Sequence, residues 1–517
     1  MTVGAIAAPP SRARVLQWLV PVLVAVVGVR VARWAASSYL VGVFHDDGVY
    51  AMLARAIASG HGFHYTQLPG SPAAIHYPPL YPLILAAAWR IDPDFPRNLS
   101  ILLGVNALCV GAAAVGWWMF ASGRLAWGSA RAALAALIAT LASPTLALSG
   151  ALLSESLFLA LLWPALLVCE DAADGSRDRR PWHAGLAIAA LMLVRTHAVA
   201  LLIAIVIVLS SRRRWHDVLW VVGVTGAVML PWLVWAHGAA PPVVLPLNGA
   251  YGSYLGWFRT GMLDGGVPFV MATIRANASE CWLLLRDRLA LGLPGLPLDL
   301  TVLMAIAAIM IGGVAMMRRA PVSIAFLASY IGIMLAWPYA PWRFLWAVWP
   351  LAMLFGMEGV RWSWSTAGRW RMAPALGAVL TALALFRTEL HAYATRGWRV
   401  PAQLASAQIA PALTWVRANT APTDVLLGEG EPVLSFHTGR RAAPPMSFTA
   451  REYLRPPDAL EGTARLRVML SAVPARYLLS LLPATQDAAR ALASTRPGLH
   501  EIARLPDSHV VVFEVIR

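Results

Sequence analysis

Apolar segments long enough to cross a bilayer recur through the first three quarters of the chain, and they constrain its fold more than any other feature. Of the 517 residues, 59% are hydrophobic and only 13% are charged, whereas a soluble globular protein carries about 25% charged residues. A helix that crosses about 30 Å of hydrocarbon needs about 20 mostly apolar residues. The sequence predicts a mainly α, polytopic membrane protein with about eleven membrane helices, at residues 14–36, 99–120, 130–149, 154–169, 183–195, 197–211, 218–237, 295–317, 321–338, 344–360 and 373–387.

The basic residues predict how these helices are oriented. With the N-terminus and its Arg12 and Arg14 in the cytoplasm, alternation places every short basic cluster in an inner loop, as the positive-inside rule requires. The net charge of +15 is therefore mainly a topology signal and gives no reason to expect a nucleic-acid partner. The other inner clusters are Arg124 and Arg131; Arg177, Arg179 and Arg180; Arg212, Arg213 and Arg214; Arg318 and Arg319; and Arg361, Arg369 and Arg371. Three larger segments then lie outside: 37–98, 238–294 and everything after about 388.

The C-terminal part has the pattern of a small soluble α/β unit. Buried strands are predicted at 424–428, 476–480 and 509–516, and helices at 403–418 and 485–494. Strands alternating with helices favour a partly parallel sheet. We therefore divide the chain into a membrane domain, 1–390, and an extracytoplasmic α/β domain, 391–517. The latter carries no phosphate-binding loop, metal-ligand spacing or nucleophile motif that we recognise, which favours a lid or an acceptor-docking domain.

Two adjacent carboxylates, Asp46 and Asp47, follow the first membrane segment. Placing charges at the edge of a bilayer costs free energy, so the pair is expected to serve chemistry, ion binding or a buried ion pair. The following stretch, 50–60, is helix-like. Apolar residues at 49, 52, 53, 56 and 57 form one stripe, which predicts a helix lying in the interface plane with this stripe toward the membrane.

A proline-rich element, Tyr77-Pro78-Pro79-Leu80, stands later in the same outer segment. Paired prolines break or sharply bend the backbone as it returns to the bilayer. Irregular backbone at that depth is tolerated only against protein or a water-filled cavity. The acidic pair and the proline element are therefore expected to line one cavity at the outer face.

Three further polar residues fall at outer turns of the predicted bundle: Glu155, Arg195 and Arg343. Each arginine taken alone is explained equally well as an interfacial residue whose head group reaches water, and Glu155 as its counter-ion. Their shared side of the membrane favours a site for an anionic substrate, because guanidinium groups pair well with phosphate oxygens.

This arrangement resembles the GT-C superfamily of integral membrane glycosyltransferases, and within it the protein O-mannosyltransferases and the bacterial lipid A aminoarabinose transferases. The resemblance rests on the order of short motifs along nearly the whole chain. They are the acidic pair with Tyr50, Pro78-Pro79-Leu80, Ser154-Glu155-Ser156, Arg343-Phe344-Leu345, Trp349-Pro350-Leu351, and Trp415-Val416-Arg417-Ala418-Asn419-Thr420 with Asp424. Two positions depart from the pattern: a lysine commonly precedes the Pro-Pro-Leu element where this chain has Tyr77, and a glutamate is usual where it has Asp47.

The resemblance implies an inverting glycosyltransferase that uses a sugar on a polyprenyl phosphate, held with its phosphate at the outer face. Asp46 would be the general base on an acceptor hydroxyl, and Arg343 with Arg195 would bind the phosphate. Asp47 and Glu155 would orient the acceptor or the base, or hold a divalent cation. An essential metal is not expected, because hard cations want several oxygen ligands and only three carboxylates are near.

Secondary contacts are expected from aromatic and imidazole groups. His76 and Tyr77 are candidate donors to the phosphate, although Tyr77 is explained at least as well as an aromatic-belt residue. In the segment 238–294, the candidate acceptor contacts are Tyr251, Tyr254 and Trp257, whose rings would stack on sugars or anchor the chain at the membrane surface.

Two other classes of function remain open at this point. A transporter or flippase of an anionic lipid-linked saccharide would also place carboxylates and arginines in a cavity, although such proteins usually show inverted repeats and midplane charges. A non-catalytic subunit of envelope-glycan assembly would keep the cavity without the chemistry. The Ala- and Arg-rich composition favours a bacterial inner membrane, with the N-terminus cytoplasmic and the C-terminal domain extracytoplasmic. The sugar and the acceptor (a lipid, a glycan or a protein hydroxyl) stay open.

Overall fold

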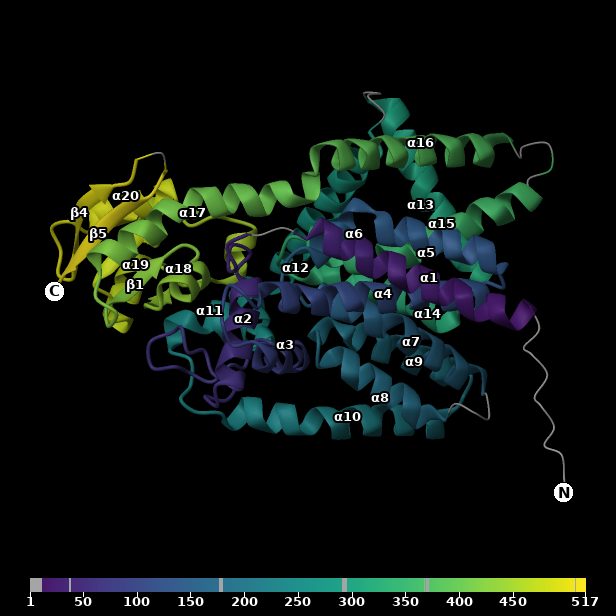
Figure 1. The fold of residues 1–517 in the computed structure, drawn as a ribbon, viewed down its shortest axis with the longest axis horizontal. Helices are drawn as coiled ribbons and strands as arrows, with labels where there is room; N and C mark the ends of the chain where they lie inside the picture. Colours follow the sequence, from purple (N-terminus) through teal and green to yellow (C-terminus); the bar gives the residue numbers. More distant parts are fainter. Residues whose placement is uncertain are drawn as a thin grey trace, which may run out of the picture.

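The computed structural model describes residues 12–36, 39–175, 180–290, 295–366, 368, 372–506 and 508–517. The arginines predicted at 177, 179, 369 and 371, and the side chains of Arg12 and Arg14, lie outside the described residues. The fold has two parts, a bundle of long helices and a C-terminal α/β domain that lies at one end of the molecule's long axis, at the end away from the start of α1 (Figure 1).

Every one of the predicted membrane segments is helical. The helices are α1 (Arg12–Ala35), α4 (Leu99–Gly123), α5 (Ser129–Leu141), α6 (Ser143–Ser149), α7 (Glu155–Asp174), α8 (Pro181–Met192), η1 (Thr196–Ala198), α9 (Val199–Ser211), α10 (Trp215–Gly238), α13 (Leu296–Met316), α14 (Pro321–Ala336), α15 (Trp342–Thr366) and α16 (Met372–Thr395). The segment predicted at 130–149 is broken into α5 and α6, which meet at 57°. This arrangement confirms a mainly α, polytopic membrane fold.

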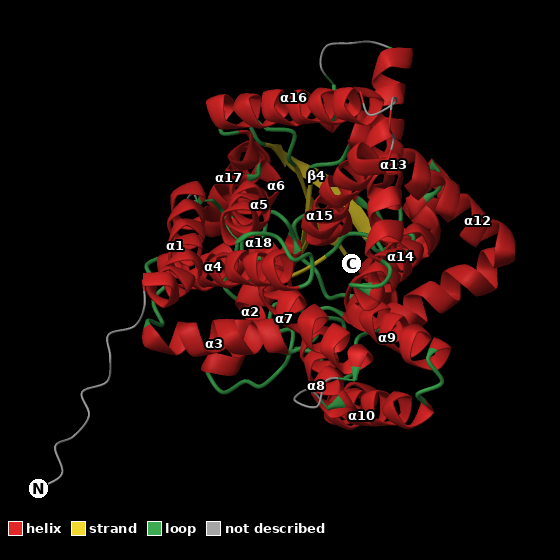
Figure 2. Cartoon of the chain, turned by 90° about the vertical axis from the view of Figure 1, so that its right-hand side faces the viewer, coloured by secondary structure: helices red, strands yellow, loops and turns green. Residues whose placement is uncertain are grey.

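By length and composition, five of the described helices can cross a membrane: α4, α7, α10, α13 (from Pro297) and α16. A sixth span results if the bent pair α5 and α6 is one span, and four apolar helices are shorter, at Leu80–Ile91, Pro181–Met192, Thr196–Ser211 and Pro321–Ala336. The predicted number of eleven spans therefore stays a prediction. Seen along the long axis, α16 lies at one edge of the bundle and α10 at the opposite edge, with strands of the C-terminal sheet behind the helices (Figure 2).

Glycine allows two of these helices to pack backbone against backbone. A Cβ atom added at Gly359 of α15 would collide with the carbonyl of Ala308 on α13, and one at Gly312 of α13 would collide with the carbonyl of Phe355 on α15. Small residues at helix interfaces let membrane helices approach closely. This contact fixes α15, the helix whose first turn carries Arg343.

The segments 37–98 and 238–294, which are predicted to lie outside, are more helical than the sequence suggests. They contain α2 (Asp46–Ala58), α3 (Leu80–Ile91), η2 (Leu245–Leu247), α11 (Asn248–Tyr251) and α12 (Tyr254–Arg288). As predicted, the proline pair interrupts the chain, and α3 begins directly after Pro79. Helix α12 was not predicted because its 35 residues mix apolar with charged and polar side chains; it is kinked at Gly266, which has a φ of 58°.

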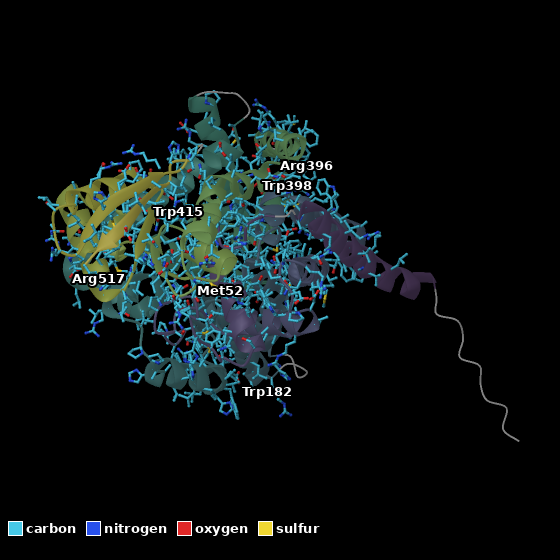
Figure 3. The ribbon with its side chains drawn as sticks, turned by 60° about the vertical axis from the view of Figure 1, so that its left-hand side comes forward. Met52, Trp182, Arg396, Trp398, Trp415 and Arg517 are labelled. Carbon is cyan, nitrogen blue, oxygen red and sulfur yellow. The ribbon has the colours of Figure 1, made fainter. Side chains whose placement is uncertain are left out.

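The prediction that the apolar stripe of α2 faces the membrane is wrong. Val49, Met52, Leu53 and Ala56 are at most 2% exposed within the protein itself. Helix α2 packs against α3 on one side and the C-terminal domain on the other, and Met52 lies at the junction of the two parts of the molecule (Figure 3). The sequence pattern identified the buried face correctly, but protein covers it in place of lipid.

The C-terminal domain is reached through η4 (Gly397–Arg399) and the long helix α17 (Val400–Asn419). Its sheet has the order β2-β1-β3-β5-β4, in which β1 pairs in parallel with β2 and β3, and β5 pairs antiparallel with β3 and β4. The partly parallel sheet is confirmed. The elements are β1 (Val425–Gly428), α18 (Glu431–Thr438), β2 (Arg441–Ala443), η5 (Ala450–Tyr453), α19 (Ala459–Ala472), β3 (Tyr477–Ser480), α20 (Pro483–Ala491), β4 (Gly498–Arg504) and β5 (Val511–Ile516).

The sequence missed the two edge strands for physical reasons. Strand β2 has three residues, too few for a period-two pattern to be visible. Strand β4 begins at Gly498 and carries charged residues among its apolar ones, since only part of it is buried. The three predicted strands form the centre of the sheet, where Leu427, Leu478 and Phe513 lie side by side and are buried.

Candidate functional site

Three helices begin at one place and bring Asp46, Glu155 and Arg343 together. Asp46 is the first residue of α2, Glu155 the first of α7, and Arg343 the second of α15. Arg343 Nη1 lies 2.6 Å from Asp46 Oδ2, while Nε donates to Glu155 Oε1 and Nη2 lies 3.4 Å from Glu155 Oε2. One guanidinium therefore bridges two carboxylates from distant parts of the chain.

A second arginine reaches the same glutamate. Arg195 precedes η1, and its Nη1 lies 2.7 Å from Glu155 Oε1 and 3.1 Å from Ser154 Oγ. Tyr50 of α2 also donates to Ser154 Oγ, at 3.0 Å. We call Asp46, Glu155, Arg195 and Arg343 the Glu155 cluster. Its two positive and two negative groups balance.

The Glu155 cluster is largely shielded from water. The Glu155 side chain is 0% exposed, those of Arg195 and Arg343 are 10% and 12% exposed, and that of Asp46 is 24% exposed. Burying ion pairs costs several kcal/mol of desolvation for each ion, which their mutual attraction only partly offsets. Asp46 is the most exposed member of the cluster.

Tyr77 and Arg343 together set the charge state of Asp46. The Tyr77 hydroxyl donates to Asp46 Oδ1 at 2.6 Å. Burial by itself raises the pKa of Asp46, but the Arg343 guanidinium, His45 and the Tyr77 hydrogen bond outweigh it and lower that pKa to about 2. Asp46 is therefore ionised at neutral pH.

Asp47 accepts hydrogen bonds from the backbone of the loop that precedes it. Its carboxylate is fully buried and accepts hydrogen bonds from the backbone N–H groups of Gly42, at 2.8 Å, and Phe44, at 3.0 Å. Burial raises the pKa of Asp47 to about 6, against the lowering effect of those amides. Neighbouring residues on a helix point about 100° apart, so the two members of the acidic pair meet different partners.

His76 lies beside the Glu155 cluster, but its ring is already engaged. Its Nδ1 lies 2.6 Å from the carbonyl oxygen of Gly252, and its ring packs on Tyr254 with 3.7 Å between ring centroids. Burial lowers the pKa of His76 to about 4. A neutral imidazole has one N–H group, and here the carbonyl of Gly252 receives it.

The three aromatic residues predicted for acceptor contacts lie in different surroundings. Tyr251 is fully buried and donates to Glu431 Oε1 at 2.8 Å. Trp257 is 9% exposed and stacks on Phe448 of the C-terminal domain. Only Tyr254, which packs on His76, lies beside the Glu155 cluster.

The sequence analysis missed two residues at this site, His45 and Glu431. Nδ1 of His45, which precedes α2, lies 3.5 Å from Glu431 Oε1 at the start of α18. A signal was available in Gly430-Glu431-Pro432, which follows buried strand β1. Ligand sites of α/β sheets lie beyond the carboxyl ends of the strands, so a glutamate at that place was a candidate.

Across the described ranges, no group of three or more His, Cys, Asp and Glu side chains is placed to hold a metal ion. The positive charge between Asp46 and Glu155 comes from Arg343.

Comparison with solved structures finds a similar fold in two proteins. The chain is similar to the crystal structure of the oligosaccharyltransferase of Archaeoglobus fulgidus tethered to an acceptor peptide, with a TM-score of 0.51 and 12% identity over 89% of this chain and 69% of that chain. No protein-family model matches the chain, and no curated protein matches it in sequence.

A further similarity is to ArnT from Cupriavidus metallidurans. Its complex with undecaprenyl phosphate gives a TM-score of 0.48 and 15% identity over 96% of this chain and 98% of that one. The apo form gives 0.44 and 15% identity over 97% and 98%. At these identities the likeness concerns the fold.

Proposed function

We propose that this protein is an inverting membrane glycosyltransferase that moves a sugar from a polyprenyl-phosphate donor to an extracytoplasmic hydroxyl acceptor. The observation that carries the proposal is the shared guanidinium of Arg343, which joins Asp46 and Glu155 at the common end of three helices. The GT-C fold supports the class of reaction, and the Glu155 cluster supports the details that follow.

The two arginines suit the donor phosphate. Arg195 and Arg343 both contact Glu155 Oε1, so their guanidinium groups face one small volume. A phosphate placed there would compete with the carboxylates for charge-assisted hydrogen bonds. It would gain negative charge as the bond to the sugar breaks, and two fixed cations would stabilise that charge.

Asp46 suits the role of general base. In the unliganded cluster it is a weak base, because Arg343 holds its pKa near 2. A phosphate that draws the Arg343 guanidinium away from Asp46 would remove this attraction and make the carboxylate more basic. Donor binding would thus prepare the base for an acceptor, and Tyr77 would keep the carboxylate oriented through its 2.6 Å hydrogen bond.

The proposed transfer step needs only the donor, the acceptor, Asp46 and the two arginines. The acceptor oxygen attacks the anomeric carbon from the face opposite the phosphate, while Asp46 Oδ2 takes the hydroxyl proton. The bond between the anomeric carbon and the phosphate oxygen breaks, and its electron pair leaves on the polyprenyl phosphate. Attack from the opposite face inverts the anomeric configuration.

The test is a transfer assay with the full chain in lipid nanodiscs. Radiolabelled polyprenyl-phosphate sugars and extracted envelope acceptors are supplied to the wild type and to Asp46→Asn. Asp94→Asn is the matched control, because the Asp94 side chain is 68% exposed and pairs only at the surface with Arg97. Donor binding is measured separately.

We expect transfer by the wild type and the control, and binding without transfer by Asp46→Asn. Equal transfer by Asp46→Asn would remove Asp46 as the base. Absence of transfer from every donor would overturn the enzyme proposal; label crossing the membrane without a glycosidic product would then indicate a transporter.

A further inference from the structure

We propose that the C-terminal domain completes the acceptor side of this site: Glu431 orients His45, and His45 accepts a hydrogen bond from a second hydroxyl of the acceptor beside Asp46. The acceptor is accordingly a saccharide that offers two neighbouring hydroxyl groups, in preference to the single hydroxyl of a serine or threonine. This inference rests on the proposed glycosyl transfer.

Helix α18 of the C-terminal domain packs closely against residues 42–48, the loop that leads into α2 and the start of that helix. A Cβ atom at Gly48 would lie 2.8 Å from Pro432 Cβ, and one at Gly42, which has a φ of 109°, would lie 2.6 Å from the backbone nitrogen of Val433. Glycine is required at both positions by this close approach of α18. Glu431, which directly precedes Pro432, is therefore held in register with the loop that carries His45 and Asp46.

His45 occupies a strained backbone conformation. Its φ is 64° and its ψ is −69°, and the N–H of Asp46 donates to the carbonyl of Phe44 at 2.8 Å. These are the features of a γ-turn of the rare, strained kind. A non-glycine residue held in such a conformation by its surroundings is typical of functional sites. The turn places His45 immediately before Asp46.

Glu431 is a buried carboxylate with two partners at this site. Its side chain is 4% exposed, and its Oε1 accepts from the Tyr251 hydroxyl and faces His45 Nδ1. In the neutral tautomer whose N–H lies on Nδ1, toward this carboxylate 3.5 Å away, Nε2 carries the lone pair. The His45 side chain is 37% exposed, so an external molecule can reach it.

The site then offers two hydrogen-bond acceptors in consecutive residues, Nε2 of His45 and the carboxylate of Asp46. Two neighbouring hydroxyl groups of a sugar ring match this pair, since one donates to His45 while the other gives its proton to Asp46. A serine or threonine side chain supplies one donor and would leave His45 without a partner. His45 is therefore an acceptor-binding residue, and Glu431 is a positioning residue that acts through it.

The experiment first identifies the product of the wild-type transfer assay. Label on a saccharide supports the proposal; label on serine or threonine, recognised by protease sensitivity and β-elimination, overturns it. Kinetics then follow for His45→Ala, His45→Gln and Glu431→Gln. Glutamine at 431 keeps an acceptor for the Tyr251 hydroxyl, and glutamine at 45 supplies an amide oxygen as acceptor.

We expect the KM for the saccharide acceptor to rise about tenfold in His45→Ala and Glu431→Gln, the loss of about one hydrogen bond. Donor binding and thermal stability should be unchanged, and His45→Gln should recover part of the loss. The control is His437→Gln, which removes a contact between His437 Nε2 and the carbonyl of Val41 at the same domain interface, 3.0 Å long. It should keep the wild-type KM.

The outcomes separate this inference from the proposed function. Wild-type transfer with an unchanged acceptor KM in Glu431→Gln overturns the role of Glu431 and leaves the glycosyltransferase intact. A KM that rises equally in His437→Gln also overturns it, because docking of the domain alone would then explain the effect. A wild-type protein that transfers nothing overturns the proposed function itself.

Discussion

Arginines from other elements meet carboxylates of helix α7 at both of its ends, in the Glu155 cluster at its N-terminus and in a second group at its C-terminus. In the second group, which we call the Asp174 cluster, Arg124 pairs with Asp171 and Asp174, and Arg212 Nη1 lies 3.4 Å from Asp174 Oδ1. The side chains of Asp171 and Asp174 are 34% and 43% exposed, whereas that of Glu155 is fully buried. The two ends share their chemistry and differ in their access to water.

The Asp174 cluster has a structural explanation. Arg212 and Arg214 also donate to the carbonyls of Ala172 and Ala173 in the last turn of α7. Cations at a helix C-terminus satisfy its free carbonyls and complement its dipole. The Glu155 cluster has no such need, because Glu155 alone complements the N-terminus of α7. Two arginines and a second carboxylate gathered there, away from water, are the arrangement on which the proposed binding site rests.

The largest expected difference between the two ends is in activity. Arg343→Lys should lower the transfer rate by about 100- to 1000-fold, because a point charge cannot bridge two carboxylates and a phosphate as a planar guanidinium does. Arg124→Lys at the other end should keep the rate. Initial rates at saturating donor measure both. Equal losses in the two variants would mean that the clusters play equivalent roles.

A second difference is expected in stability. Glu155→Gln leaves two buried arginines short of a counter-charge and should cost about 3–5 kcal/mol. Asp174→Asn removes two ion pairs of a carboxylate that is 43% exposed and should cost about 0–1 kcal/mol. Thermal melting in identical nanodiscs compares them. A mild effect of Glu155→Gln would show that the Glu155 cluster is hydrated in the membrane and would weaken the contrast.

The acidic pair itself gives a pH prediction. The pKa of Asp47 is raised to about 6 in the folded protein from an ordinary value of 3.8. Its contribution to stability is therefore fully present below pH 3.8 and is lost as pH rises through 6, a change of about 3 kcal/mol at most. The stability of the wild type relative to Asp47→Asn should fall between pH 4 and pH 7, as melting temperatures would show. A difference independent of pH would contradict the raised pKa.

Metal removal should have the smallest effect. Because Arg343 supplies the positive charge between Asp46 and Glu155, we expect the transfer rate to survive EDTA treatment unchanged. The measurement is the rate before and after chelation, with magnesium and manganese added back separately. Restoration of lost activity by either ion would show that a cation joins the site when the donor binds.

Much of this architecture could be predicted from local sequence. Apolar runs identified the helices of the bundle, and buried β-branched and leucine-rich runs identified the three central strands of the sheet. The short strand β2, the partly charged strand β4 and the mixed composition of α12 show no clear hydrophobic periodicity, so these elements were not predicted. For the site, the order of motifs selected Asp46, Glu155 and Arg343, and the position of Arg195 at a predicted outer turn added this residue; the structure brings these four together.

Hydrophobicity and charge are properties of each segment, so the amino-acid sequence was enough to predict a polytopic membrane protein with a small C-terminal α/β unit. Other features became visible only in the three-dimensional structure. Asp46 pairs with Arg343, whereas Asp47 accepts hydrogen bonds from its own loop. The apolar side of α2 is covered by protein, and Glu431 lies beside His45. These contacts join residues hundreds of positions apart, or depend on the direction of one side chain on a helix. Such contacts and side-chain directions depend on how whole helices and strands pack together, which the composition of a single segment does not predict.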